Sequence, residues 1–247
     1  RGSIGGTTFG RNRSGAYARN RTVPINPNSQ AQADSRYLFS QTAFAYTNLT
    51  ATQKKQWSDY AALTTFFVNR LGEAYTPSGR QLFQYCNMNL SIVQAELQFG
   101  GGGEFIGIQY GAIPAINVPI FDLTQKPDPP TFVGENKQFS ALVASGGLTE
   151  LKSVANANPP NAVDDIQRII VEASPFVRPS IENVKGAFRL VATIPVTAAT
   201  DLDILGPYAG RFQPNGLVQG MRAVVRLSTV NKGGLRSDPV EVTIITE

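Results

Sequence analysis

The chain of 247 residues is long enough for one large domain or two smaller ones, each with its own hydrophobic core. Its composition of 42% hydrophobic and 16% charged residues, with 23 glycines and 16 prolines, favours β structure with many turns over a helical bundle. With one cysteine and no histidine, it excludes an intrachain disulfide and lacks the commonest general base and metal ligand, which argues against most hydrolases and zinc enzymes.

The positive charge is concentrated near the N-terminus. Residues 1–30 hold five of the 22 basic residues and none of the 18 acidic ones, so the rest of the chain carries 17 basic and 18 acidic groups. The basic character therefore belongs to one segment and not to a nucleic-acid-binding body. No run of apolar residues approaches the length of a membrane-spanning helix, and no segment has the basic, apolar and small-residue parts of a signal peptide in order. We therefore expect neither a membrane span nor a secretion signal.

Residues 1–27 are predicted to form a basic extended arm that contains a β-hairpin. Residues 12–15 have the composition of a tight turn, and they separate two short extended stretches. Pro24 and Pro27 then keep the chain extended and separate the arm from the helical pattern that follows.

Residues 28–99 are predicted to be helical. A first helix is expected over 29–46, and Thr50 with Gln53 forms a capping box that begins a second. A third helix is predicted to have Pro77 at its first position. Its apolar stripe consists of Leu82, Phe83, Cys86, Leu90 and Val93. The aromatic residues expected in the core of the first two helices are Tyr37, Phe39, Phe44, Trp57 and Tyr60.

A linker rich in glycine and proline is predicted over 100–119, because it opens with four consecutive glycines. Residues 120–247 are predicted to form an immunoglobulin-like β-sandwich, since short β-rich runs alternate there with turn residues. The expected strands cover 138–144, 166–173, 187–195, 220–230 and 240–246. The predicted fold class is thus multi-domain α+β: a β-hairpin arm and helices, followed by an all-β sandwich.

The groups that carry chemistry in other proteins have plain structural interpretations here. Cys86 lies in an apolar helical pattern and is expected to be a buried thiol. The acidic pairs Asp164 with Asp165 and Asp201 with Asp203 lack the spacing of a calcium loop and are interpreted as solvated turn residues. We therefore predict no catalytic residue, no cofactor site and no metal site, and we expect the chain not to be an enzyme.

The candidate interaction site lies in the arm and comprises Arg11, Arg13, Tyr17, Arg19 and Arg21. In one interpretation, Tyr17, Arg19 and Arg21 share one side of an extended segment and contact phosphates and bases. In the other, the arm reaches over a neighbouring subunit and its arginines pair with carboxylates and backbone carbonyls. The second is favoured because the rest of the chain is close to neutral.

Several sequence blocks in the first 95 residues resemble structural (virion) proteins of phages and prophages. These blocks are RNRSGAYAR at 11–19, PINP at 24–27, Gln32, Arg36, Leu49-Thr50 with Gln53 and Trp57, and SGRQLF at 78–83. The C-terminal part is similar in general style to fibronectin type III and immunoglobulin-like modules. The resemblance implies a virion component, assembled in the host cytoplasm, such as a capsid decoration or vertex protein, a connector or a tail protein. It supplies no active-site residue.

Together these observations predict a non-catalytic virion structural protein that assembles through its arm and helical region. Its expected partners are further copies of the chain and other virion proteins, with no membrane partner and no cofactor. Two alternatives stay open. One is a cell-surface, adhesin-like binding module that uses an immunoglobulin-like domain, and the other is a nucleic-acid-associated protein that acts through the arginine-rich arm.

Overall fold

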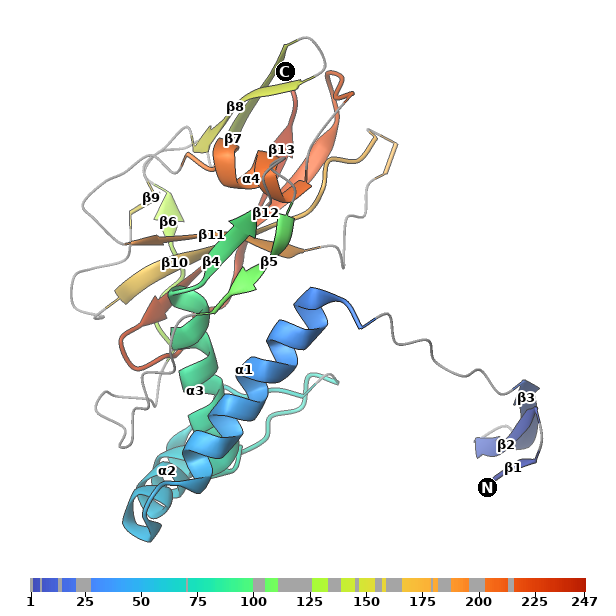
Figure 1. The fold of residues 1–247 in the computed structure, drawn as a ribbon, viewed down its shortest axis with the longest axis vertical. Helices are drawn as coiled ribbons and strands as arrows, with labels where there is room; N and C mark the ends of the chain where they lie inside the picture. The colour runs from blue at the N-terminus through green and yellow to red at the C-terminus, as the bar shows by residue number, and fades with distance from the viewer. Residues whose placement is uncertain are drawn as a thin grey trace.

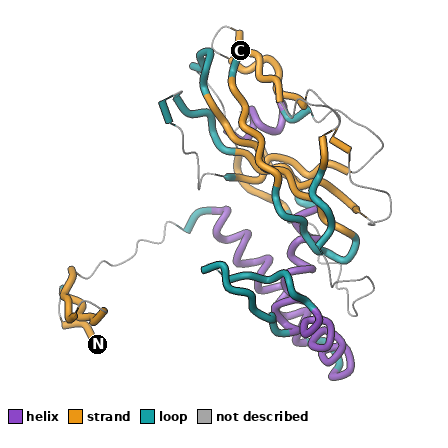
Figure 2. The backbone as a smooth tube through the Cα atoms, turned by 180° about the vertical axis from the view of Figure 1, so that it is seen from behind, coloured by secondary structure: helices purple, strands orange, loops and turns teal. Residues whose placement is uncertain are grey.

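The computed structural model describes residues 2–4, 6–12, 15–20, 28–69, 71–99, 105–110, 126–132, 139–144, 147–153, 157–158, 166–178, 180–181, 188–195, 203–212 and 216–247. Within these residues the fold is mixed α+β, with four helices and several antiparallel sheets, which agrees with the predicted class at that level (Figure 1). A small sheet at the N-terminus lies apart from the body of the molecule, as both the front and the back view show (Figure 1, Figure 2).

This separate sheet is formed by the arm. Its strands β1 (Gly2–Ile4), β2 (Thr7–Asn12) and β3 (Gly15–Asn20) are antiparallel in the order β1-β2-β3. The predicted hairpin is β2–β3, in which Asn12 lies opposite Gly15 across a connection of two residues. Strand β1 was not predicted, and residues 21–27 lie outside the described residues.

Three helices follow, α1 (Gln30–Thr47), α2 (Ala51–Leu63) and α3 (Gly79–Val93). The capping box of α2 is present, because the Thr50 backbone N–H donates to Oε1 of Gln53 at 2.9 Å and the Gln53 N–H donates back to the Thr50 hydroxyl at 3.3 Å. The prediction that Pro77 occupies the first position of α3 is wrong. A second capping box begins this helix, since the Ser78 backbone N–H donates to Oε1 of Gln81 at 2.7 Å.

The helices enclose a core of their own around α3. All five members of the predicted stripe on α3 are buried. Trp57 of α2 is fully buried and meets Phe83 of α3 edge-on, with ring centroids 5.3 Å apart. Leu49, in the turn between α1 and α2, closes this cluster.

The largest sheet has four antiparallel strands in the order β11-β10-β12-β13. They are β10 (Ile166–Ala173), β11 (Arg189–Pro195), β12 (Arg222–Asn231) and β13 (Val240–Ile245), each close to a predicted strand. The expected alternation along β12 is observed, because Ala223, Val225 and Leu227 are fully buried on one face.

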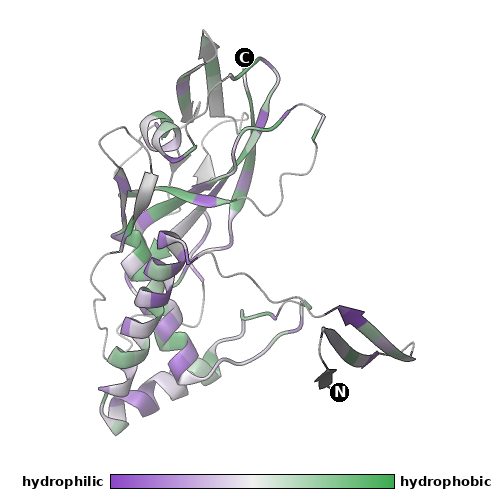
Figure 3. Cartoon of the chain, turned by 45° about the vertical axis from the view of Figure 1, so that its right-hand side comes forward, coloured by the Kyte–Doolittle hydropathy of each residue, from purple (hydrophilic) through white to green (hydrophobic). Residues whose placement is uncertain are grey.

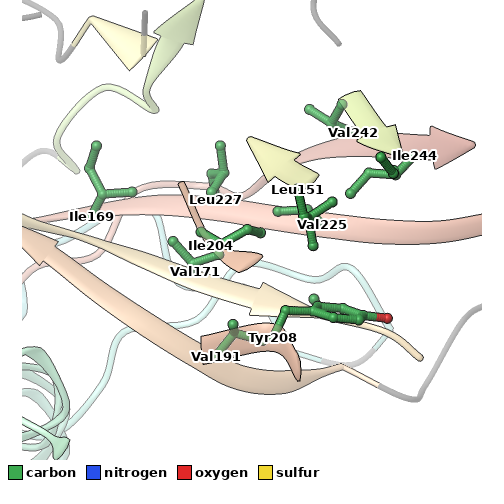
Figure 4. Packing of buried hydrophobic residues seen from close by; sticks show 12 residues of the cluster. Leu151, Ile169, Val171, Val191, Ile204, Tyr208, Val225, Leu227, Val242 and Ile244 are labelled. Atoms are coloured by element: carbon green, nitrogen blue, oxygen red, sulfur yellow. The ribbon is translucent and has the colours of Figure 1, made fainter. Parts of the chain in front are cut away.

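That face packs against a second layer and forms the main core (Figure 4). The layer consists, in the described part of the chain, of a hairpin of β7 (Phe139–Ala144) and β8 (Gly147–Ser153) with a short helix, α4 (Leu205–Phe212). This layer contributes Leu151, Ile204 and Tyr208 to the core. The Tyr208 hydroxyl also donates a hydrogen bond to the Ser174 carbonyl at 2.9 Å. Neither β8 nor α4 was predicted.

The opposite face of the sheet packs on α3. Val93 of α3 forms a buried cluster with Ile170 of β10 and Val230 of β12. The loop between β12 and β13 continues this contact, because Leu235 is fully buried in the helical core. The helices and the sheet therefore share buried side chains.

Glycine is required at one point of this contact. Gly234 has φ of +85°, and a Cβ there would collide with the backbone carbonyl of Cys86. The Asn89 side-chain amide donates to the Gly234 carbonyl at 2.9 Å, which links the β12–β13 loop to α3 at this close contact.

Two short strand pairs complete the described fold. β4 (Glu96–Phe99) pairs with β5 (Phe105–Gln109), and β6 (Thr131–Phe132) pairs with β9 (Ala157–Asn158). The linker expected over 100–119 is thus interrupted by a strand at 105–109. Its four glycines lie outside the described residues.

Candidate assembly surfaces

The hairpin register sorts the side chains of the arm onto two faces. Because cross-strand partners share a face, Phe9 lies with Ala18 and Arg11 with Ala16 on one side of the sheet. Thr8 and Arg19 lie on the other side. Both hydrophilic and hydrophobic stretches are visible on these strands (Figure 3). One face of the arm therefore carries an apolar row together with Arg11, and the other face carries Arg19.

Tyr17 packs within the sheet, across its neighbouring strand. It lies opposite Gly10, and a Cβ at Gly10 would come within 2.6 Å of the tyrosine ring. The absence of a side chain at Gly10 lets the ring lie over β2, which compensates for the glycine in the strand. Phe9 and Tyr17 nevertheless remain 46% and 44% exposed, so the arm does not bury either ring.

The structure places only part of the predicted interaction site. Tyr17 and Arg19 share a face, as their spacing predicted, whereas Arg11 lies on the opposite face. Arg13 and Arg21 lie outside the described residues. Among the residues that the structure describes, no carboxylate pairs with Arg11 or Arg19.

A second exposed surface lies on α1, where the sequence interpretation is partly wrong. Trp57 is in the core as expected, but Tyr37, Phe39 and Phe44 are 66%, 52% and 65% exposed. The reason is that α1 turns only a narrow stripe toward α3, with Leu38 and Thr42 at its centre. Helical spacing alone did not reveal which of its apolar residues belong to that stripe.

The segment between α2 and α3 adds exposed apolar side chains to the helical region. Asn69 organises its turn, because its side-chain amide donates to the Glu73 carboxylate at 2.8 Å and its side-chain oxygen accepts from the Leu71 N–H at 2.9 Å. This turn holds Leu71 83% exposed and Val68 61% exposed. These two side chains add exposed apolar surface to the helical region, and no sequence pattern identified them.

The candidate chemical groups have structural roles where they are described. Burial raises the pKa of the Cys86 thiol far above its usual range, as expected for a structural cysteine. Asp203 accepts the Leu205 backbone N–H at 3.0 Å, next to the start of α4. Asp164, Asp165 and Asp201 lie outside the described residues. Within the described ranges, no three cysteine or carboxylate side chains gather as they would around a metal ion.

Comparison with known proteins leaves the family open. No family model and no curated protein matches the chain. Among solved structures, it is similar to part of the spore cortex lytic enzyme SleM of Clostridium perfringens, with 16% identity and a TM-score of 0.30 over 56% of this chain and 32% of that one. It is also similar to part of the twitchin kinase region of C. elegans, with 18% identity and a TM-score of 0.28 over 49% and 17%. Likenesses this weak carry no argument about function.

The chain thus spans a third or less of each of these two structures. None of the helices in the described ranges has the length and apolar character needed to cross a membrane.

Proposed function

We propose that this chain is a non-catalytic structural protein of a virion, which assembles into oligomers through its basic arm and its helical region. The arm carries the proposal, because it folds as a sheet with exposed rings and arginines and lies apart from the body (Figure 1). None of its described side chains is buried. Ordering its backbone costs about 1–2 kcal/mol per residue, so a partner surface is needed to offset that cost.

The distribution of charge supports a protein partner. Arg11 and Arg19 lie on opposite faces of the arm, so a phosphate backbone that runs along one face contacts only one of them. A cleft between neighbouring subunits encloses both faces and offers carboxylates and carbonyls to each arginine. The exposed aromatic side chains of α1 and the exposed Leu71 supply apolar surface for the same assembly.

The virion assignment rests on the sequence blocks that resemble phage proteins. Two of these blocks form the helical framework: Thr50 and Gln53 cap α2, and Ser78 caps α3. A role as a capsid decoration or vertex protein, a connector or a tail component is consistent with such a framework that carries an arm. For residues 120–247 we propose an immunoglobulin-like sandwich built on the β10–β13 sheet.

Deletion of residues 1–27 tests the proposal. We expect sedimentation velocity to show loss of oligomers, and incorporation into particles to fail, while the melting of the isolated chain hardly changes. A matched variant, Arg178→Ala, removes an exposed cation of the body and should assemble normally. Normal assembly of the truncated chain would refute the proposal.

One observation favours a second candidate function, nucleic-acid association. Tyr17 and Arg19 share a face, which suits stacking on a base next to a phosphate contact. If the arm acts in this way, single-stranded DNA binding should weaken steeply with salt, and Arg19→Ala should reduce the slope of log K against log salt by about one. Salt-independent or undetectable binding would rule this candidate out.

A further inference from the structure

The edges of the two sheets differ in how they are covered. At the β13 edge of the large sheet, Ala141 of β7 bridges to Thr246, and the Glu247 N–H donates to the Ala141 carbonyl at 2.9 Å. At the other edge of that sheet, β11 is in contact with β4. By contrast, no strand within the described residues pairs with the outer edge of β3, six residues long and exposed from Ala16 to Asn20. An open edge of this length is a template for another strand.

The hairpin register determines which backbone groups face that open edge. In an antiparallel pair, alternate residue pairs exchange both backbone hydrogen bonds, and across a two-residue connection the closing pair is one of these. Asn12 with Gly15, Gly10 with Tyr17 and Thr8 with Arg19 are therefore the bonded pairs. The N–H and C=O groups of Ala16, Ala18 and Asn20 consequently point outward.

Only two registers let β3 of one copy pair with β3 of another about a two-fold axis near its centre. One has Ala18 opposite itself, and the other has Tyr17 opposite itself. The first gives more outward bonds, because Ala18 pairs with its copy and Ala16 pairs with Asn20 in both directions. It also places Arg19 of each copy beside Tyr17 of the other, at the close distance of a non-bonded pair.

The packing of Tyr17 favours the same register. Its ring already lies across Gly10, toward β2, so it is poorly placed to stack on a second Tyr17 beyond the opposite edge. A long arginine side chain reaches the ring from that edge. On the other face, Phe9 lies beside Ala18, so pairing about Ala18 produces an apolar row of Phe9, Ala18, Ala18 and Phe9 across the two copies.

We propose that two copies of this chain join their arms by antiparallel pairing of β3 about Ala18, which forms a continuous six-stranded sheet. This inference rests on the proposed function and specifies the partner of the arm as a second copy. In this two-fold pairing, one short segment is complementary to a second copy of itself, because Arg19 of each copy lies beside Tyr17 of the other.

Cysteine cross-linking of the full chain tests the register. Directly opposite residues of a bonded pair have Cα atoms about 5.5 Å apart, within the range that a disulfide spans. We expect Ala18→Cys to form disulfide-linked dimers under mild oxidation and Ala16→Cys, which faces Asn20, to form few. The native Cys86 is fully buried and should give no background. Preferential linkage of Tyr17→Cys, or equal linkage of Ala16→Cys and Ala18→Cys, would overturn the proposal.

A charge at the edge provides a second test. Ala18→Lys places two like charges opposite each other, and we expect it to raise the dimer dissociation constant about fivefold or more. Ala16→Lys is the matched control, and its effect should be clearly smaller. If deletion of residues 1–27 abolishes assembly but Ala18→Lys does not, the strand pairing is wrong and the proposed function stands. If the deletion itself has no effect, the proposed function fails.

Discussion

The β1–β3 sheet and the β10–β13 sheet use the same antiparallel pairing in very different surroundings. The larger sheet is covered on one face by β7, β8 and α4 and on the other by α3. Among the described residues, none covers either face of the arm, and the rings of Phe9 and Tyr17 stay almost half exposed. Backbone hydrogen bonds contribute little net free energy to folding. The difference in stability between the two sheets therefore comes mostly from the burial of apolar side chains. The large sheet is stabilised by contacts within the chain, whereas the described residues of the arm gain no comparable burial from it.

The largest expected effect is at the contact between the large sheet and α3. Gly234→Ala should reduce the free energy of unfolding by about 3–5 kcal/mol, because the added Cβ combines an unfavourable φ with a backbone collision. Urea denaturation followed by circular dichroism measures this loss. Gly216→Ala is the control, since Gly216 has φ of +68° with open space around it, and should cost only about 1–2 kcal/mol.

The neighbouring leucine should give the next largest effect. Leu235→Ala removes a fully buried side chain from the helical core and should cost about 2–4 kcal/mol in chemical denaturation. Ile245→Ala, at a residue 48% exposed on β13, should cost less than about 1 kcal/mol. Equal losses for the two variants would contradict the view that the β12–β13 loop completes the helical core.

A smaller effect is expected from the ion pair under the same loop. Arg236 Nη2 lies 2.6 Å from Glu172 Oε2, with both side chains about a quarter exposed, and its Nε donates to Ser228 at 2.7 Å. Glu172→Gln should therefore cost about 1–2 kcal/mol. Glu241→Gln, which breaks the more exposed pair with Arg226, should cost about 0.5 kcal/mol or less. A thermal melt of each variant ranks the two.

The smallest effect on stability should come from the arm. Phe9→Ser and Tyr17→Ser remove exposed rings and should change the free energy of unfolding of the isolated chain by less than about 0.5 kcal/mol. The same variants should weaken oligomers in sedimentation velocity. A large loss of stability in either variant would show that the arm belongs to the fold of its own chain.

Local signals in the sequence predicted much of the fold. The capping box at Thr50 and the alternation along β12 depend on neighbours in the chain, and both are present as expected. Helix α4 was missed because its sequence, LGPYAGRF, contains two glycines and a proline, and only the burial of Ile204 and Tyr208 favours it. Packing of α3 on the sheet depends on residues more than seventy positions apart, which no local pattern reports.

The candidate site was predicted to a similar extent. The alternation of side chains along a strand placed Tyr17 and Arg19 together correctly. It did not indicate that Arg11 lies on the opposite face, because this depends on the pairing register. The exposure of Tyr37 and Phe44 depends on how little of α1 meets α3, a tertiary property that helical spacing leaves undetermined.

The burial of Leu235 beside Leu49 and Trp57 also bears on the order of events during synthesis. The helical core combines Leu49 and Trp57 with Leu235, which follows Trp57 by 178 positions in the chain. Contacts of such long sequence separation form late, and they slow folding. While the ribosome is still extending the chain, the arm has already emerged and the helices lack their last core residue. Completion of the helical core therefore waits for synthesis of the β12–β13 loop, whereas the strands of the arm are made long before it.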